Sequence, residues 1–208
     1  MTGRFIVFEG GEGCGKSTQA ARLAGHQDAL LTRQPGGTSI GARLRELLLD
    51  GVAGDVAPRT EALLMAADRA QHVDEVVRPA LADGRDVVCD RYIPSSIAYQ
   101  GFGRGLDPGE VRRISDWAVD GLWPDLVVLL VVPPEEALAR TGGARDRIEA
   151  AGDGFHRRVD AAFRDMAADD PQRWRVIDGL GTEQQVWERV LAAVAGRFGA
   201  DDGDRADG

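Results

Sequence analysis

Short apolar runs alternate along the 208-residue chain with longer segments in which apolar residues recur at helical spacing. The apolar runs are of strand length and lack the polar alternation of a half-exposed strand, so they indicate strands buried on both faces. The expected strands are residues 4–9, 29–32, 86–90, 126–132 and 174–177. The expected helices are residues 16 to about 24, 39–49, 58–82, 108–120, 134–140, 154–168 and 183–198.

This order of elements predicts an α/β fold, in which helices cover both sides of a parallel sheet. Ligands of such sheets bind beyond the carboxyl ends of the strands. Glu9 and Asp90 end two of the expected strands, so a functional site is expected in the loops that follow them.

Net charge, apolar content and cysteine content limit the partners and the cellular setting that we expect for the protein. The formal net charge is −9, and nucleic-acid surfaces are usually basic, so we expect no nucleic-acid partner. No apolar run approaches the ~18 residues of a membrane span and no targeting leader opens the chain, so we expect no membrane. Cys14 and Cys89 suggest no disulfide framework and indicate a reducing, cytoplasmic setting. We expect one domain over residues 1–198, followed by an acidic, Gly-rich, disordered tail at 199–208.

The loop after the first expected strand carries the strongest motif of the chain. Lys16 is the only lysine among 25 lysine and arginine residues, and it lies where the P-loop pattern requires a flexible ammonium to reach nucleotide phosphates. Backbone N–H groups of this loop and the N-terminus of the next helix would hold the phosphates, and Ser17 would offer a hydroxyl to Mg²⁺. The motif predicts a nucleoside triphosphate site made of Gly10, Gly11, Glu12, Gly13, Cys14, Gly15, Lys16, Ser17 and Thr18.

A carboxylate and a guanidinium follow the third expected strand, as Asp90 and Arg91. Alone, such a pair would be read as an ion pair at the end of a strand. Beside a P-loop, Asp90 can hold Mg²⁺-bound water and Arg91 can clamp a phosphate. A guanine-reading Asn-Lys-x-Asp motif is excluded because the chain has no second lysine.

Several further motifs follow the P-loop along the chain. The P-loop stretch at residues 8–18 is followed by Thr32-Arg33-Gln34-Pro35-Gly36-Gly37-Thr38 and by Leu44-Arg45-Glu46-Leu47-Leu48-Leu49. Then come Ala66-Ala67-Asp68-Arg69-Ala70-Gln71-His72, Asp90-Arg91-Tyr92 and Ser95-Ser96-Ile97-Ala98-Tyr99-Gln100-Gly101. Asp146-Arg147-Ile148-Glu149 and Phe155-His156-Arg157-Arg158-Val159 complete the set. In this combination and order, the motifs resemble those of the bacterial thymidylate kinases, and the resemblance runs from Arg4 to about Val194.

The resemblance implies a P-loop kinase-type three-layer sandwich with a central parallel sheet of five strands. It also implies transfer of the ATP γ-phosphoryl group to dTMP, with Mg²⁺, in a homodimer whose interface the helical segments 39–49 and 58–82 could supply. Those segments could equally belong to the core. The rival readings are the same reaction on another deoxynucleoside monophosphate, and a nucleotide-binding regulatory protein without turnover.

The resemblance also implies roles for individual residues. Glu12 would contact the deoxyribose 3′-hydroxyl or the nearby phosphate region. Arg45 and Arg91 would hold the acceptor phosphate, and Arg69 would bind thymine O4. Ser96 and Gln100 would read the polar edge of the base, and Tyr99 would crowd the 2′ position of the sugar. Without the motifs, Arg45 and Arg69 could be solvated surface arginines and Tyr99 an ordinary core aromatic residue.

A lid is implied at about residues 141–154. The P-loop contains no arginine, so the lid would supply the arginine that stabilises the transition state, and Arg145 and Arg147 are the candidates. The resemblance also places Arg33, Gln34, Pro35 and Met65 among the substrate-binding residues, and the chain departs from the family pattern at two of these positions. Gln34 replaces a glutamate whose charge would face Mg²⁺-bound water, and Met65 replaces an aromatic residue that stacks on thymine.

Overall fold

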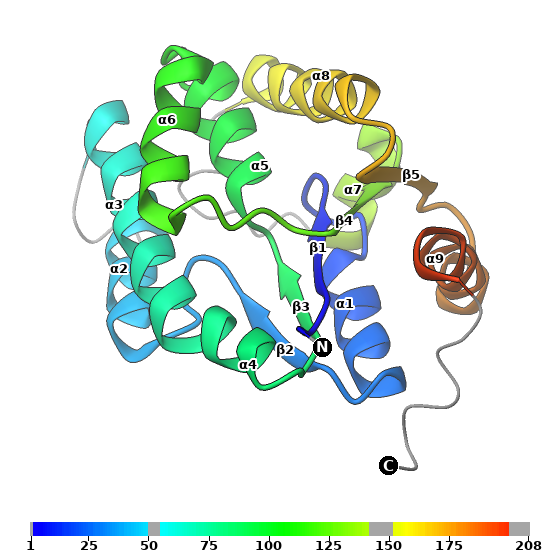
Figure 1. Ribbon diagram of the computed structural model, residues 1–208. Coiled ribbons are helices and arrows are strands. Elements are labelled where there is room, and N and C mark those ends of the chain that lie inside the picture. Colours follow the sequence, from blue (N-terminus) through cyan, green and yellow to red (C-terminus); the bar gives the residue numbers. More distant parts are fainter. Residues whose placement is uncertain (1, 50–54, 142–151, 200–208) are drawn as a thin grey trace.

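The computed structural model describes residues 2–49, 55–141 and 152–199. Within these residues, five parallel strands form one sheet in the order β2-β3-β1-β4-β5. The strands are β1 (Phe5–Glu9), β2 (Leu30–Arg33), β3 (Val87–Asp90), β4 (Leu126–Val131) and β5 (Trp174–Asp178). Helices lie on both sides of the sheet (Figure 1). The expected α/β fold with a five-stranded parallel sheet is confirmed.

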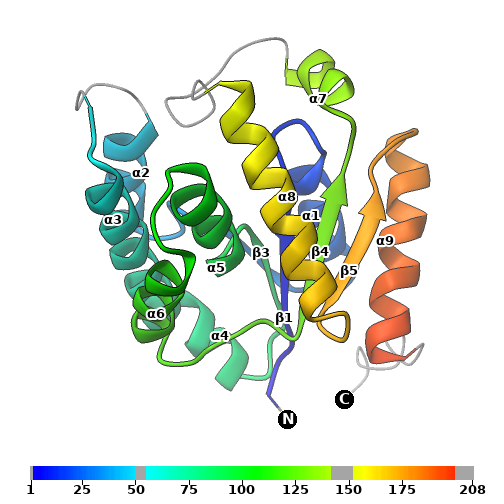
Figure 2. The ribbon, with the colours of Figure 1, turned by 90° about the horizontal axis from the view of Figure 1, so that it is seen from above.

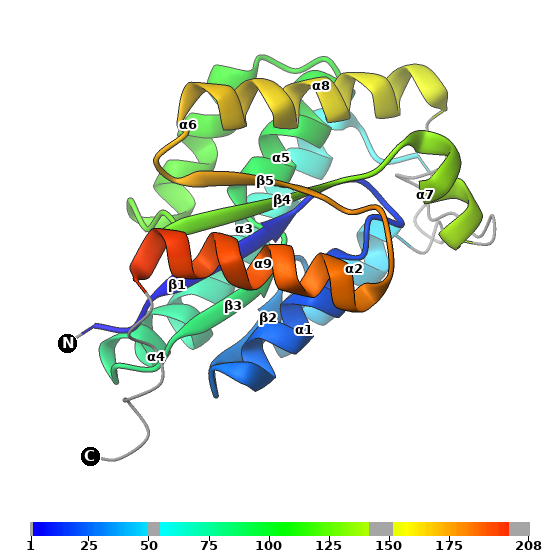
Figure 3. The same cartoon turned by 90° about the vertical axis from the view of Figure 1, so that its right-hand side faces the viewer.

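The central strands are buried on both faces because both of their side-chain rows are apolar. One row, with Ile6 and Phe8 of β1, packs against α1 (Lys16–His26) and α9 (Glu183–Phe198). The other row, with Phe5 and Val7, faces α6 (Pro108–Val119) and neighbouring helical segments. Figure 3 shows these layers, with α6 and α8 (Asp153–Asp169) on one side of the strands and α1 and α9 on the other.

The remaining helices follow the expected pattern closely. The long segment expected at residues 58–82 is α3 (Pro58–His72), a π-helical turn η1 (Val73–Val77) and α4 (Arg78–Ala82). Pro79 follows the π turn and has no N–H to donate, so a regular α-helical ladder cannot continue through it. The other two are α2 (Ser39–Leu49) and α7 (Pro134–Thr141).

One helical segment was not expected from the sequence. Directly after β3, the chain forms α5 (Ile93–Ser96), which continues into the π-helical segment η2 (Ile97–Gly103). The strands all point toward the same end of the sheet, where the loop after β1 and helix α7 lie (Figure 2). The β3–α5 connection leaves β3 at this end, because Asp90 is the last residue of that strand. Residues predicted on separate motifs therefore meet beyond the carboxyl ends of β1 and β3.

Candidate active site

The loop between β1 and α1 has the backbone shape of an anion-binding cradle. Gly10 and Gly13 have positive φ angles of 140° and 68°, which side chains other than glycine rarely adopt. A Cβ at Gly13 would also lie 2.4 Å from the Ala137 carbonyl oxygen. Gly15 precedes α1 in a left-handed conformation, and Lys16 is the first helical residue. The loop therefore presents backbone N–H groups and the positive end of the α1 dipole to one point.

Two cations of different motifs meet at this loop. The Lys16 Nζ donates to the Gly11 carbonyl oxygen at 3.2 Å and lies 3.5 Å from the Glu12 carboxylate. Arg91 donates to the same Glu12 carboxylate, and at 3.1 Å to the Gly10 carbonyl oxygen. One carboxylate thus bridges the ammonium of the P-loop and the guanidinium that follows β3. An arrangement that holds one anion between two cations can also hold phosphoryl oxygens there.

Asp90 and Ser17 form a site that suits Mg²⁺. The Ser17 hydroxyl donates to Asp90 Oδ2 at 2.5 Å. Asp90 Oδ1 is buried and has no hydrogen-bond partner among the residues that the structure describes. Across those same residues, His, Cys, Asp and Glu side chains nowhere form a group of three that could hold a metal ion. A single carboxylate and a hydroxyl fit Mg²⁺, which completes its shell with water and nucleotide phosphates.

The backbone that carries Arg91 is fixed by a buried carboxylate. Glu9 is fully buried and accepts hydrogen bonds from the Tyr92 N–H at 2.9 Å, the Ser95 N–H at 3.2 Å and the Ser95 hydroxyl at 2.6 Å. Burial raises the pKa of Glu9 to about 7, against the opposing effect of the Arg91 charge and these hydrogen bonds. Glu9 therefore holds the start of α5 and, next to it, Arg91 in its left-handed conformation with φ 69°.

A cavity of about 190 Å³ opens next to the P-loop. It brings together residues that the sequence assigned to the acceptor and to the catalytic groups. Those predicted residues are Glu12, Lys16, Ser17, Arg33, Gln34, Pro35, Arg45, Met65, Arg69, Asp90, Arg91, Ser96, Tyr99 and Gln100. Leu49, Asp68, Tyr92 and Ser95 also line the cavity and were not predicted.

Arg69 is a buried arginine and not a solvated one. Its side chain on α3 is 2% exposed. Nε donates to Gln34 Oε1 at 3.0 Å, and the two terminal nitrogens donate to Ser115 Oγ at 3.2 Å and Ser96 Oγ at 2.6 Å. Burial lowers the pKa of Arg69 from its ordinary value, although a guanidinium stays protonated in proteins. Since a guanidinium has five N–H groups, two donors remain for a ligand in the cavity.

The side chain of Gln34 lies between Arg69 and His72, and its backbone N–H donates to the Asp90 carbonyl oxygen at 2.9 Å. Its oxygen accepts from Arg69, so its nitrogen is turned to His72 Nδ1, 2.8 Å away. An amide nitrogen can only donate. His72 Nδ1 is therefore unprotonated, and Nε2 donates to Thr32 Oγ1 at 2.6 Å. Burial, together with the Arg69 charge, lowers the pKa of His72 to about 4, so this imidazole is neutral.

Gln100 lies in the segment η2, and its side chain is hydrogen-bonded to Glu61 of α3. Gln100 Nε2 donates to Glu61 Oε1 at 2.9 Å. Arg104 donates to the same carboxylate through Nε at 3.2 Å and through a terminal nitrogen at 3.1 Å. Gln100 and Glu61 are 1% and 0% exposed. Glu61, like Glu9 and His72, was not among the predicted site residues. The signal available in the sequence was a polar side chain at a core position of a helix or strand.

The remaining predicted residues surround the same cavity. Arg45 is half-buried and donates to the Pro35 carbonyl oxygen at 3.1 Å. Met65 packs with Tyr99 in one apolar cluster. Tyr99 makes edge contacts with Phe155, and the Arg91 guanidinium lies 5.0 Å from its ring centre. Tyr99 is thus both a core aromatic residue and a wall of the cavity. Arg145 and Arg147 lie outside the described residues.

A second, larger hollow of about 890 Å³ also borders the P-loop, and it shares Glu12 and Tyr99 with the first. Gly11 and Cys14 line it from the loop, and residues of α7 and α8 form its walls. It extends to Asp178 and Leu180, which follow β5. This hollow is the space in which the rest of a nucleotide bound at the P-loop can lie.

Comparisons with known proteins agree on one family. The model of a family described as thymidylate kinase matches residues 8–190. A protein of Cutibacterium acnes named thymidylate kinase is 50% identical over 201 residues, which cover 94% of this chain and 98% of that protein. One of Leifsonia xyli subsp. xyli with the same name is 51% identical over 203 residues, covering 94% and 96%. The crystal structure of thymidylate kinase from Ehrlichia chaffeensis superposes with a TM-score of 0.77 at 30% identity, covering 93% of this chain and 99% of that one.

Proposed function

The chain belongs to the thymidylate kinase family, and we propose that its site transfers the γ-phosphoryl group of ATP to dTMP, giving dTDP and ADP. The single observation that carries this assignment is the meeting of Lys16 and Arg91 on one carboxylate, that of Glu12. The P-loop ammonium belongs to a donor site and the guanidinium to an acceptor site, so two phosphates would meet between them. Phosphoryl transfer requires this positioning and charge stabilisation more than it requires covalent chemistry.

On the donor side, the P-loop amides and Lys16 hold the triphosphate. Asp90 and Ser17 would hold Mg²⁺, since Asp90 Oδ1 is buried and unpaired within the described residues. Mg²⁺ neutralises charge on the phosphate oxygens when it is bound. The hollow that reaches Asp178 and Leu180 suits the nucleoside of ATP. The lid arginine, Arg145 or Arg147, remains a proposal, as does the lid itself at about residues 141–154.

On the acceptor side, Arg91 lies at the P-loop, where it contacts Gly10 and Glu12. Arg91 and Arg45 would clamp the phosphate of dTMP, and Arg33 also lines the cavity. Arg69, Ser96 and Gln100 line the same cavity and would offer hydrogen bonds to the base. Met65 and Tyr99 supply apolar contact, and a methionine can pack on a ring face. Closing such a site around both ligands excludes water, which would otherwise hydrolyse ATP.

An acceptor panel tests this proposal against its rivals. ADP release is measured in a coupled assay with ATP, Mg²⁺ and dTMP, dUMP, dCMP, dGMP or UMP. We expect the highest kcat/KM with dTMP. A higher value with another monophosphate would assign the chain to that acceptor, and no turnover with any of them would indicate a nucleotide-binding regulatory protein.

The Arg69→Ala variant tests the proposed base contact. Loss of a charged hydrogen bond costs about 1.5–3 kcal/mol, so KM for dTMP should rise about 10-fold to 100-fold. KM for ATP should stay within about twofold, because the P-loop lies outside the Arg69 network. Equal losses for the two nucleotides would contradict the assignment of Arg69 to the acceptor.

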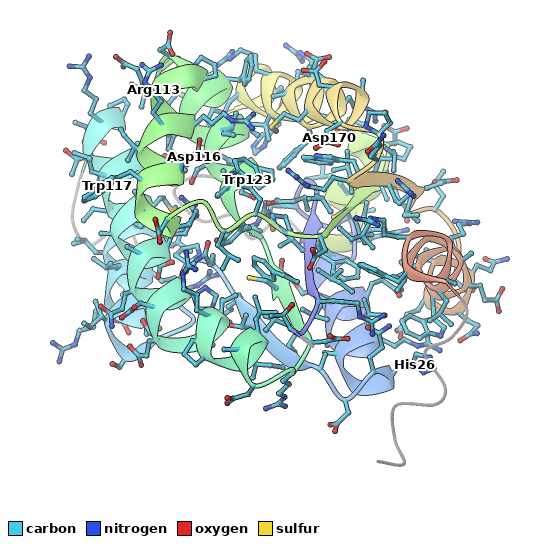
Figure 4. The ribbon with its side chains drawn as sticks, in the orientation of Figure 1. His26, Arg113, Asp116, Trp117, Trp123 and Asp170 are labelled. Carbon is cyan, nitrogen blue, oxygen red and sulfur yellow. The ribbon has the colours of Figure 1, made fainter. Side chains whose placement is uncertain are left out.

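We also propose that two copies associate through α2, α3 and α6. Each of these adjacent helices exposes large apolar side chains: Ile40 (51%) and Leu47 (44%) on α2, Leu63 (56%) on α3 and Trp117 (85%) on α6. Figure 4 shows Trp117 at the outer edge of α6. A second copy of the same surface would bury these side chains.

None of the described helices is long and apolar enough to cross a membrane. We place the reaction in the cytoplasm, where the buried free thiols of Cys14 and Cys89 stay reduced.

A further inference from the structure

The orientation of the Gln100 amide decides what kind of atom this side chain offers to a base in the acceptor cavity. An amide can present either its oxygen, which accepts, or its nitrogen, which donates. In the structure, the Gln100 nitrogen is used, because Nε2 donates to Glu61 Oε1 at 2.9 Å. Within the part of the chain that the structure describes, the Gln100 oxygen accepts no hydrogen bond, and Gln100 lines the cavity. The carbonyl oxygen is therefore left to accept a hydrogen bond from a base in the cavity.

Glu61 allows only this orientation. Arg104 donates to both of its oxygens, at 3.2 and 3.1 Å, so the carboxylate is the acceptor in an ion pair. An ionised carboxylate has acceptors and no donor. Turning the Gln100 amide around would set its oxygen against that carboxylate, deep inside the protein, where an unpaired polar contact is costly. Glu61 thus acts on the cavity through Gln100 without touching it, since it is absent from the lining residues.

Arg69 supplies the complementary half of the pattern. Three of its N–H groups are bound by Gln34, Ser115 and Ser96, and the two that remain are donors. The cavity therefore offers a base one donor group and, separately, one acceptor. Thymine and uracil carry an N3–H donor beside the O4 acceptor, and match both. Cytosine has an acceptor at N3 and an amino donor at C4, and matches neither.

We propose that Glu61 is a positioning residue for base selection: it fixes the Gln100 carbonyl oxygen toward the cavity and thereby selects pyrimidines that carry N3–H over cytosine. This inference rests on the proposed function, because it takes the cavity to be the acceptor site. Glu61 does not line the cavity, so it would influence base selection without touching the substrate.

The Glu61→Gln variant tests the inference. Glutamine keeps the shape of Glu61 but has a donor end as well as an acceptor end, so Gln100 is free to turn either way. We expect the ratio of kcat/KM for dTMP to that for dCMP to fall about tenfold, the equivalent of one hydrogen bond. The ratio for dTMP to dUMP should stay within about twofold of the wild type, because both bases have N3–H and differ only in the methyl group.

Matched measurements separate base selection from a general loss of structure. Arg104→Lys retains a cation beside an unchanged Glu61 carboxylate, so the dTMP to dCMP ratio should be retained. If Glu61→Gln lowers kcat/KM for all three acceptors alike, or leaves the dTMP to dCMP ratio unchanged, Glu61 has no role in selection. A wild-type protein that uses dCMP better than dTMP would instead overturn the proposed function itself, whatever the variant does.

A crystal structure of the wild type with dTMP tests the same geometry without a substitution that could fail to fold. Gln100 Oε1 should lie within hydrogen-bonding distance of thymine N3, with Nε2 still at Glu61. A thymine whose N3 faces another group would overturn the inference.

Discussion

Replacing Glu9 with glutamine is expected to change how the stability of the protein depends on pH. Glu9 is fully buried, and its pKa is about 7 against an ordinary value of 4.5. The substitution is nearly isosteric. Glutamine Oε1 can still accept from the N–H groups of Tyr92 and Ser95, which both bind one oxygen of Glu9. Its nitrogen can donate to the Ser95 hydroxyl, which binds the other oxygen.

The sign and size of the effect follow from the raised pKa. Below pH 4.5 the Glu9 carboxyl is protonated in both the folded and the unfolded protein, and its contribution to the free energy of unfolding is fully present. Between pH 4.5 and 7 the unfolded chain loses the proton and the folded protein keeps it, so the free energy of unfolding falls as pH rises. Each pKa unit corresponds to about 1.36 kcal/mol. The wild type should therefore lose about 2.5 kcal/mol relative to Glu9→Gln between pH 5 and pH 8.

Urea unfolding of both proteins at several pH values measures this difference. The comparison must be between variant and wild type, because other groups titrate in the same range and cancel only in the difference. His72, for example, acts in the opposite direction, with a pKa lowered to about 4. Glu188→Gln, at an exposed glutamate of α9, controls for the loss of one surface charge. The advantage of Glu9→Gln over the wild type in free energy of unfolding should grow as pH rises. If it stays constant or shrinks, Glu9 does not retain a proton in the folded protein.

Four further outcomes are expected. Lys16→Ala should lower kcat at least ~1,000-fold in the coupled assay, because no other described ammonium can reach the P-loop phosphates. Asp90→Asn should raise the Mg²⁺ concentration for half-maximal rate at least ~10-fold, measured by Mg²⁺ titration at saturating nucleotides. His72→Asn retains an acceptor for Gln34 and removes the titrating ring, so in urea unfolding it should gain stability over wild type as pH falls from 6.5 toward 4. Trp117→Glu should shift the protein from dimer to monomer in sedimentation equilibrium, and an unchanged mass would count against the α2–α3–α6 interface.

The sheet and most helices could be predicted from the sequence because their signals are local. Strands such as Phe5–Glu9 are continuous apolar runs, and helices such as Pro58–His72 repeat apolar residues at helical spacing. Ile93–Gly103 lacks both signals, since Pro94, Ser95 and Ser96 begin it and it continues as a π-helix that ends in glycine. Glu9 supplies what the local sequence lacks, by accepting from the N–H groups at its start from 83 and 86 residues away.

The predicted site residues could be found because they stand in contiguous motifs, and they line one cavity. The residues that orient them could not be found in this way. Glu61 acts on Gln100, and His72 acts on Gln34, in each case across 38 or 39 residues. No sequence spacing marks these contacts, so Glu61 and His72 look like any other polar residues on a helix.

Gln34 and His72 show why a departure from the family pattern can be conservative in physical terms. A glutamate at position 34 would face His72 Nδ1 with an acceptor, so the imidazole would carry its proton on Nδ1 and accept from the Thr32 hydroxyl at Nε2. Burial and the Arg69 charge oppose a second ring proton, and lower the pKa of His72 to about 4. Glutamine suits the other neutral tautomer, because its oxygen accepts from Arg69 while its nitrogen donates to His72 Nδ1. The residue at position 34 and the tautomer of His72 are therefore matched.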